Sequence, residues 1–286
     1  EGTPSYHAMT VGGLKYSFDS VRGYSDPPGY QDPGDGTRLD KVQPEADLAL
    51  WSRCQDAPER VCLPNGCSSV IHDTHPYERR GAKRDSSVST ILPGLGHVSL
   101  GRGRQANQML AQLHFSGGYG HQHGDNLNLM LWAKERELLP DVGYTWTQMR
   151  CWATSTLGHN LVVVDRRDQT TGPQGNLQLY VPGNLTDPTS PQIAAVEASA
   201  EPAYAAQVKG LDLYRRLLVM VPVSADDAYL VDLFRVRGGK LHDWTIEGDA
   251  DRDTVATCSL PLSGDRKWLL EEARRACTQV AIIRKG

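Results

Sequence analysis

The stretch Gly117–Trp132, GGYGHQHGDNLNLMLW, decides how the rest of the sequence is interpreted. It places His121, His123 and Asp125 on alternate residues directly after a glycine-rich turn. In a strand alternate side chains share one face, whereas on a helix positions two apart point in nearly opposite directions. Leucines at 127, 129 and 131 continue the alternation. The stretch therefore predicts a strand that begins with the polar trio and continues with core positions.

Similar short apolar runs recur from Ser99 to the C-terminus. Each is about the length of a strand, is alternating or β-branched, and is bounded by Gly, Pro, Asp or Asn. The runs are QANQMLAQLHF, NLNLMLWA, NLVVVD, LQLYV, YRRLLVMVPV, AYLVDLFRV and TQVAIIR. Helical periodicity is weak in this region. We therefore expect an antiparallel β-sandwich rather than a parallel α/β fold.

Residues 1–90 differ from the rest of the chain in their predicted secondary structure. Two segments, SYHAMTVGGLKYSF and PEADLALWSRC, predict helices, and the Pro/Gly-rich run YSDPPGYQDPGDG lies between them. Residues 54–92 are polar and rich in turn formers, which favours a linker or an insertion. The sequence thus predicts a mainly β protein with an α N-terminal part, divided into residues 1–90 and 91–286.

Composition excludes two classes of function. The net charge of −4 gives no reason to expect a nucleic-acid partner, which usually requires a basic stripe. No run approaches the ~18 apolar residues that would span a bilayer, so we expect no membrane insertion. One local basic cluster, YERRGAKRD, contains Arg79, Arg80, Lys83 and Arg84. We interpret it as a solvated loop, with a polyanion-binding site as the alternative.

Cysteine usage and the N-terminus leave alternatives open. The six cysteines permit disulfides in an oxidising compartment but do not show them. Cys54, Cys62 and Cys67 could form a zinc knuckle with His72 and His75, although no CxxC pair is present. The chain begins at Glu1 without a charged-then-apolar leader, so we expect either a removed leader or a fragment.

Two further residues can join the histidine motif at one edge of the predicted sheet. Asp141 lies in ELLPDVGY, and His159 leads the strand in TLGHNLVVVD. Two neutral imidazoles and one carboxylate from three neighbouring strands form an N2O site for a divalent metal with an open position. Structural histidines are the alternative, and Asp125 could simply cap the turn. A cupin is disfavoured because no glutamate follows HxH at the usual spacing.

Five segments together resemble the heparinase II/III-type polysaccharide lyases. The combination GHQHGDNLNLMLWAKERELLPDVGY and STLGHNLVVVDRRDQ is similar to the central motifs of the C-terminal domain of that family. LPGLGHVSLGRG upstream and VDLFRVRGGKLHDWTIEG downstream extend the match. EGTPSYHAMT resembles an E-G-S-P-x-Y-H stretch on a helix of the family's toroid domain, with Thr3 where Ser is commoner.

The resemblance implies the end of an α/α toroid packed against a large β-sandwich, with the active site in the groove between them. It implies acid and base roles for Tyr6 on one wall and His121 on the other, and it assigns zinc to His123, Asp141 and His159. Asp125 would then hold the turn. The substrate-binding candidates are His7, Arg79, Arg80, Arg102 and Arg104. The family's upstream Asn-His segment, which neutralises the substrate carboxylate, is not found, and the C-terminus AIIRKG resembles a truncation.

The function implied is cleavage of a uronic-acid-containing glycan, similar to heparan sulfate, alginate or chondroitin, by β-elimination. The resemblance also implies a periplasmic or secreted protein and leaves a homodimer open. Two other functions remain as hypotheses: a non-catalytic glycan-binding or structural sandwich, and a cupin-like metal oxygenase.

Overall fold

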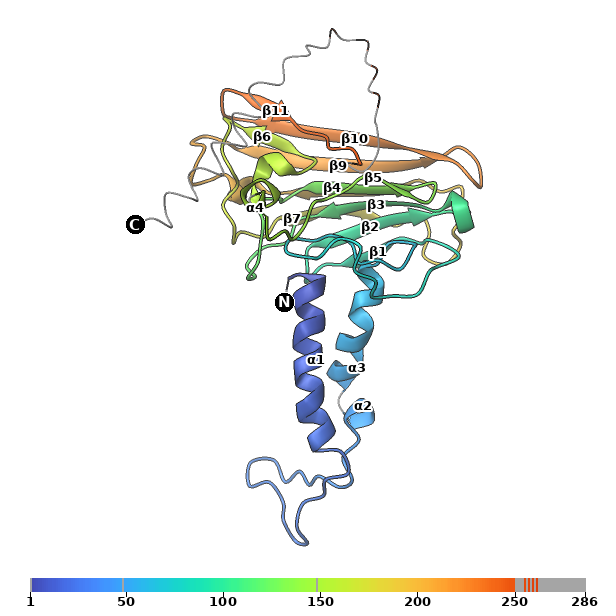
Figure 1. Ribbon diagram of the computed structural model, residues 1–286, viewed down its shortest axis with the longest axis vertical. Helices are drawn as coiled ribbons and strands as arrows, with labels where there is room; N and C mark the ends of the chain where they lie inside the picture. The colour runs from blue at the N-terminus through green and yellow to red at the C-terminus, as the bar shows by residue number, and fades with distance from the viewer. Residues whose placement is uncertain are drawn as a thin grey trace.

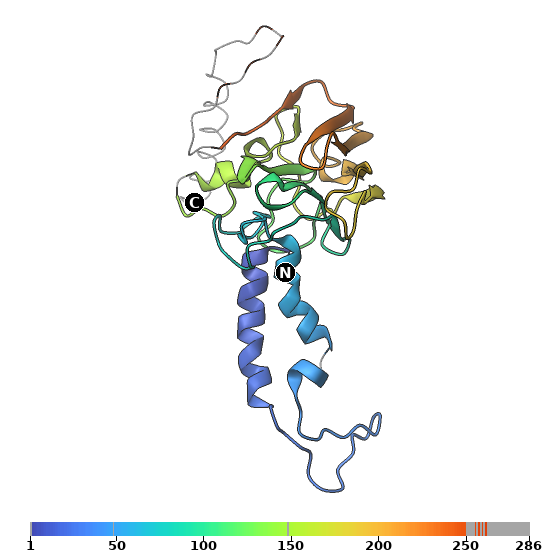
Figure 2. The same cartoon turned by 90° about the vertical axis from the view of Figure 1, so that its right-hand side faces the viewer.

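A β-sandwich forms the bulk of the molecule, and the helical N-terminal part projects from it (Figures 1 and 2). The structure is a computed structural model that describes residues 2–47, 49–147 and 149–249, together with residues 255, 257, 259 and 261. The predicted strand in TQVAIIR lies outside the described residues. The mainly β fold with an α N-terminal part is confirmed.

The helical part is an antiparallel pair. Helix α1 (Pro4–Ser20) runs away from the sandwich, and α2 (Pro44–Asp47) and α3 (Ala49–Asp56) lead back to it (Figure 1). Thr3 caps α1, because its side chain accepts a hydrogen bond from the backbone N–H of Tyr6 and Pro4 occupies the first turn. The rings of Phe18 and Trp51 meet at 4.6 Å between centroids and join α1 to α3.

Two antiparallel sheets make the sandwich. The first has the order β1-β2-β3-β4-β5 and the second β10-β9-β8-β7, while β11 pairs with β6 separately. The strands of the first sheet are β1 (Thr90–Leu92), β2 (His97–Arg102), β3 (Met109–His114), β4 (Asn128–Ala133) and β5 (Arg136–Leu139). The others are β6 (Val162–Val164), β7 (Asn176–Val181), β8 (Ala194–Ser199), β9 (Leu213–Pro222), β10 (Ala228–Arg237) and β11 (His242–Trp244).

The short helices lie in the connections. Helix α4 (Arg150–Thr154) and the 3₁₀ turn η3 (Thr156–Gly158) come between β5 and β6. The other 3₁₀ turns are η1 (Ala57–Val61), η2 (Gln105–Asn107) and η4 (Glu201–Ala203).

The main core lies between the two sheets. Leu113 of β3 and Leu129 of β4 face Val196 of β8 and Leu218 of β9 in one buried cluster. The expected parity of positions 127, 129 and 131 is confirmed, since all three belong to this cluster or pack on it. The opposite face of the first sheet is covered as well, so its central strands are buried on both sides although they carry polar residues such as Ser99 and Gln112.

The segment that covers this second face is the one expected to be a linker or insertion. Val61 and Ile71 pack on Met130, and Leu63 packs on Trp132. Residues 68–74 are all buried. The segment is therefore part of the packed structure, and it brings His72 and Asp73 to the edge of the sheet next to the histidine motif. The division of the chain at residue 90 stays a prediction.

In the described residues we find no helix with the length and apolar character needed to cross a membrane.

Candidate functional site

The histidine motif lies in a loop that precedes strand β4, not in the strand itself. Residues 117–127 are turns and irregular backbone, and β4 begins only at Asn128. The expected extended geometry of the trio is therefore wrong. His121 has a φ of 63°, a left-handed conformation that costs a side-chain-bearing residue about 1–3 kcal/mol. Strain of this kind concentrates at functional sites, where the surrounding structure holds it in place.

Tyr6 and His121 meet face to face. Their rings are 3.6 Å apart between centroids with an interplanar angle of 15°. Tyr6 lies in the first turn of α1, at the end of the helix that contacts the sandwich, and the side chain of His121 is 42% exposed. The two residues to which the resemblance assigns acid and base roles are 115 positions apart in the chain but adjacent in space.

This contact corrects one expectation. We expected Tyr6 on one wall of a groove and His121 on the other, with substrate between them. At the observed spacing the rings are in van der Waals contact, which leaves no room for a sugar ring between them. Substrate must therefore approach the stacked pair from outside rather than lie between the two rings.

A buried carboxylate, Asp73, connects both histidines of the motif. Its Oδ2 lies 3.1 Å from His121 Nδ1, and its Oδ1 lies 2.9 Å from His123 Nε2. Arg150, from α4, donates to both oxygens at 2.5 and 2.7 Å. The Asp73 side chain has no solvent exposure. One carboxylate thus accepts four hydrogen bonds from three side chains.

The charge of this group is set by its partners. Burial alone would raise the pKa of Asp73, but hydrogen bonds from His123 and Arg150 outweigh burial and hold this pKa well below its usual value. Asp73 is therefore ionised at neutral pH. The Arg150 guanidinium also lies over the Tyr144 ring, 4.7 Å from its centroid. Burial, followed by the nearby Tyr6 hydroxyl, raises the pKa of Tyr144, so its hydroxyl stays protonated.

His123, Asp141 and His159 converge as expected for a metal site. One candidate ligand atom from each lies within 4.8 Å of the other two, and all three residues are buried. Asp141 follows β5 in a loop closed by Gly143, which has a φ of 61°, and a Cβ there would meet the Thr74 carbonyl oxygen at 2.3 Å. Glycine is required at this position because both the backbone conformation and the close approach exclude a side chain.

The donor atoms fit a divalent metal such as zinc. His123 Nδ1 and His159 Nε2 are buried without a hydrogen-bond partner, and His159 Nε2 lies 3.4 Å from Asp141 Oδ2. The other ring nitrogens are held from behind, His123 Nε2 by Asp73 and His159 Nδ1 by the Ser155 carbonyl at 2.7 Å. Metal-binding histidines are usually held in this way.

The charge balance around Asp141 also favours a cation. Burial raises the pKa of Asp141 to about 7, and the nearby Asp125 carboxylate adds to this rise. Asn128 Nδ2 and the Gly143 N–H nevertheless donate to its two oxygens at 2.7 and 2.8 Å and orient the carboxylate. Two neutral imidazoles and an oriented carboxylate form a donor set that zinc commonly uses.

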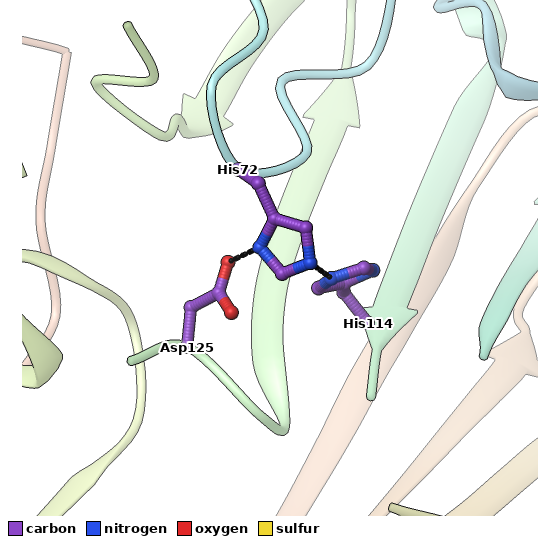
Figure 3. Close-up of side chains that lie close together, drawn as sticks. All are labelled: His72, His114 and Asp125. Carbon is purple, nitrogen blue, oxygen red and sulfur yellow. Dashed lines mark hydrogen bonds and ion pairs between the residues drawn. The ribbon is translucent and has the colours of Figure 1, made fainter. Parts of the chain in front are cut away.

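A second buried group is formed by His72, His114 and Asp125 (Figure 3), and it lies beside the first, since the rings of His72 and His123 are 6.0 Å apart between centroids. His72 stands between the other two, with Nδ1 2.9 Å from Asp125 Oδ2 and Nε2 3.2 Å from His114 Nε2 (Figure 3). Its Nε2 also lies 2.7 Å from Ser116 Oγ. Both nitrogens of His72 are thus engaged in hydrogen bonds. We expected the Asp125 side chain to hold the turn, and this is wrong. It instead bonds to His72 and so anchors the loop that carries Asp73.

The substrate-binding candidates separate into three sets. His7 Nε2 lies 2.8 Å from the carbonyl oxygen of Cys54 in α3, so its ring packs between the helices. Arg79 and Arg80 are exposed on the loop whose Glu78 accepts a hydrogen bond from Ser5, next to Tyr6. Arg80 is itself paired with Glu78.

Arg102 and Arg104 lie at the far end of the first sheet. Arg102 pairs with Met109, whereas His97, at the other end of β2, pairs with His114 near the histidine motif. The six-residue strand separates these ends by about 17 Å. Arg102 is only 3% exposed and donates to the carbonyl oxygens of Ser224 and Asp227. The expectation that Arg102 contacts substrate is wrong, and Arg104 follows it at the same remote end.

Sequence interpretation missed Asp73, Arg150 and Tyr144. Asp73 lies in VIHDTH, where an apolar pair followed by His-Asp was a usable signal of a buried polar loop. The zinc knuckle expected as an alternative for His72 does not form, since His72 groups with His114 and Asp125 instead. Among the described residues, neither potential metal group contains a cysteine, and Cys54, Cys62 and Cys67 are free thiols.

Known proteins match this chain over the part that contains the site. The sequence profile of the family described as "Heparinase II/III-like, C-terminal" matches residues 105–251, just over half of the chain. A curated relative, the exo-oligoalginate lyase of Saccharophagus degradans, is 24% identical over 224 residues, which cover 74% of this chain and 29% of that protein. The chain therefore spans less than a third of the length of this relative.

Two solved structures have the same fold. Heparan sulfate lyase HepC from Pedobacter heparinus superposes with a TM-score of 0.61 at 16% identity, covering 88% of this chain and 41% of its own. A heparinase III gene product gives a TM-score of 0.60 at 18% identity, covering 83% of this chain and 38% of its own. The profile match, the motif order and this shared fold agree, and the chain belongs to the heparinase II/III-like family through its C-terminal domain.

Proposed function

We propose that the protein is a polysaccharide lyase that cleaves a uronic-acid-containing glycan by β-elimination. The observation that carries the proposal is the contact between Tyr6 and His121, which brings two proton-transfer groups from separate parts of the chain to one point. Family membership supports the reaction class, and the named relatives include an alginate lyase and a heparan sulfate lyase.

The reaction requires two proton transfers and no water. A base removes the proton at C5 of the uronate, and the C5–H electron pair forms the C4–C5 double bond. The C4–O bond breaks, and an acid protonates the leaving oxygen. Tyrosine and histidine suit these steps because each can donate or accept a proton when its surroundings adjust its pKa.

The roles of this pair follow from their positions. His121 holds Nδ1 toward Asp73, which leaves Nε2 as its atom for substrate. Tyr6 presents its hydroxyl from the adjacent stacked ring. The C5 proton is weakly acidic, so the developing negative charge on the uronate carboxyl group must also be stabilised. Arg79 and Arg80, on the loop next to Tyr6, are our candidates for contacting substrate carboxylate or sulfate groups.

Zinc is proposed at His123, Asp141 and His159. Elimination needs no metal-bound hydroxide, so the ion would supply structural order and positive charge near the acid–base pair. Holding His123 in place fixes the loop, and with it the strained backbone at His121 only two residues away.

The stacked pair suggests which uronates suit this site. Acid and base acting from one side favour substrates in which the C5 proton and the C4 oxygen lie on the same face of the ring. Glucuronate and mannuronate have this arrangement, whereas guluronate, iduronate and galacturonate have the two groups on opposite faces. We therefore propose a preference for glucuronate-type or mannuronate-type units.

The test is to incubate the full-length protein with a panel of uronate polysaccharides and to follow ultraviolet absorbance of the unsaturated product. We expect a rise with heparosan or polymannuronate and a slower rise with polyguluronate. His121→Ala should lower kcat by about 10²–10⁴-fold, the usual contribution of a general acid or base. Tyr6→Phe should have a similar effect.

Matched controls use exposed residues of the same types. Tyr16→Phe removes an exposed hydroxyl from α1, and His242→Ala removes an exposed imidazole; both should keep wild-type activity. Absence of product from every uronate polymer, with glycan binding that is indifferent to His121→Ala, would instead identify a non-catalytic glycan-binding protein. Bound iron with oxygen consumption would identify a metal oxygenase.

A periplasmic or secreted location and a homodimer complete the proposal. An acidic polymer is encountered outside the cytoplasm, which supports the first. Cell fractionation tests the location, and light scattering of the purified protein tests the assembly.

A further inference from the structure

We propose that Asp73 is the positioning residue of this site, because its carboxylate fixes the tautomers of both histidines in the HxH motif. The proposal rests on the proposed function for the roles of His121 and His123, but the hydrogen bonds that it invokes can be measured without that function.

The first hydrogen bond sets the atom that His121 offers to substrate. An ionised carboxylate only accepts hydrogen bonds, so the ring nitrogen 3.1 Å from Asp73 Oδ2 must carry the proton. That nitrogen is Nδ1. The neutral ring then has its lone pair on Nε2, at the opposite side of the imidazole from the carboxylate.

The second hydrogen bond sets the atom that His123 offers to a metal. Its Nε2 lies 2.9 Å from Asp73 Oδ1 and must be the protonated nitrogen for the same reason. Nδ1 is left with a lone pair, and it is this atom that is buried without a partner. The two histidines therefore use opposite nitrogens, although they are two residues apart and share one carboxylate.

Asp73 can impose these tautomers because it is held rigidly. Arg150 donates to both of its oxygens, so rotation of the carboxylate would break two charge-assisted hydrogen bonds. On the other side, the neighbouring His72 has no solvent exposure and is fixed by Asp125 and Ser116. His72 thus belongs to one polar group and Asp73 to the other, so the loop that carries them cannot shift without breaking hydrogen bonds in both groups.

The variant that tests the idea is Asp73→Asn. An asparagine of the same shape accepts a hydrogen bond through its oxygen but donates through its nitrogen. It can therefore keep the tautomer of one histidine only, and it favours the wrong tautomer of the other. A comparable change of aspartate to asparagine behind a catalytic histidine lowers kcat by about 10⁴-fold in the serine proteases.

Three measurements on the full-length protein separate the two effects. Nitrogen-15 NMR of the imidazoles, without metal, should show His121 protonated at Nδ1 and His123 at Nε2, and Asp73→Asn should change at least one of them. Zinc affinity should fall about 10–100-fold in the variant. At zinc concentrations that saturate the variant, kcat should still be about 10²–10⁴-fold lower, with KM little changed, because the remaining defect lies in His121.

Asp187→Asn is the matched control, since Asp187 also accepts local hydrogen bonds but lies in an exposed turn. It should leave all three measurements unchanged. Wild-type zinc affinity and wild-type kcat in Asp73→Asn would overturn the proposal, as would a His121 ring protonated at Nε2 in the wild type. If the wild type binds no zinc and cleaves no uronate polymer, the proposed function fails, while the NMR measurement still decides whether Asp73 sets the tautomers.

Discussion

The two buried groups of this protein have the same composition and different hydrogen bonding. Each consists of two histidines and one aspartate, and the two groups are neighbours: His72 and His123 lie 6.0 Å apart between ring centroids. In the group of His123, Asp141 and His159, one nitrogen of each ring has no hydrogen-bond partner. In the other group, both nitrogens of the central His72 are engaged.

This difference distinguishes the candidate metal site from the group that we interpret as an anchor. A metal needs lone pairs that point at one place, with the far side of each ligand held by a second group. In the hydrogen-bonded chain the central His72 instead uses both of its nitrogens internally, which holds the backbone in place, although His114 Nδ1 has no partner. The same residue types thus provide a candidate binding site in one place and a rigid support for it in the other.

The largest effect should be the complete loss of bound metal from one group only. We expect one zinc per chain in the purified protein, and none in His123→Ala or His159→Ala, because two ligands do not retain the ion. His72→Gln and His114→Gln should still bind one equivalent by elemental analysis after dialysis. Zinc retained by His159→Ala but lost from His114→Gln would reverse the two assignments.

A smaller but still large effect should follow from breaking the anchor. His72→Leu leaves the Asp125 carboxylate buried, and the described residues contain no lysine or arginine paired with it. An uncompensated buried charge costs about 3–5 kcal/mol, and we expect the free energy of unfolding in urea to fall by that amount.

The exposed His242 provides the control for this measurement. His242→Leu should change the free energy of unfolding by less than about 0.5 kcal/mol. Replacing the pair together, in His72→Leu/Asp125→Leu, should recover part of the loss because no charge remains buried. A single variant as stable as the wild type would show that the chain does not anchor the loop.

The smallest effect should come from the pH dependence of His97, which adjoins the anchor with its ring 6.0 Å from that of His114. Burial lowers the pKa of His97 to about 4, from an unfolded value of 6.5. Between these values the unfolded state binds more protons, so stability is unaffected above pH 6.5 and falls as the pH drops toward 4. The loss should reach about 3 kcal/mol.

Urea unfolding at pH 7.5 and pH 4.5 measures this contribution when the wild type is compared with His97→Gln. The variant lacks the titrating group and should lose less stability over the same interval. Equal losses in both proteins would mean that His97 remains accessible to protons in the folded state.

Much of the fold follows from local patterns. Six of the seven predicted strands lie in the described residues and are present, because alternation and turn residues act over a few positions. The convergence of His123, Asp141 and His159 was also expected, and the structure brings these residues together. The extended form predicted for the HxH trio failed because tertiary contacts with Asp73 hold that loop in a turn.

Other parts of the site could not be predicted from local pattern. Asp73 and Arg150 are 77 positions apart, and nothing in either segment identifies the other as its partner. Arg102 resembled any other candidate for binding an anionic substrate, yet its guanidinium is used by the carbonyl oxygens of the β9–β10 turn. Pairing between distant segments depends on how the sheets pack, which no short window of sequence contains.

By itself the sequence determined the class of fold, the family and the residue types at the site, since these depend on periodicity, turn chemistry and motif order. The tertiary structure decided which histidine nitrogens are free, which carboxylate connects the two histidines of the motif, and which histidine has both nitrogens engaged. The physical reason is that hydrogen bonds to a buried imidazole are made by partners from distant parts of the chain. Which ring nitrogens these partners occupy, rather than the residue type, sets the chemistry that each histidine can perform.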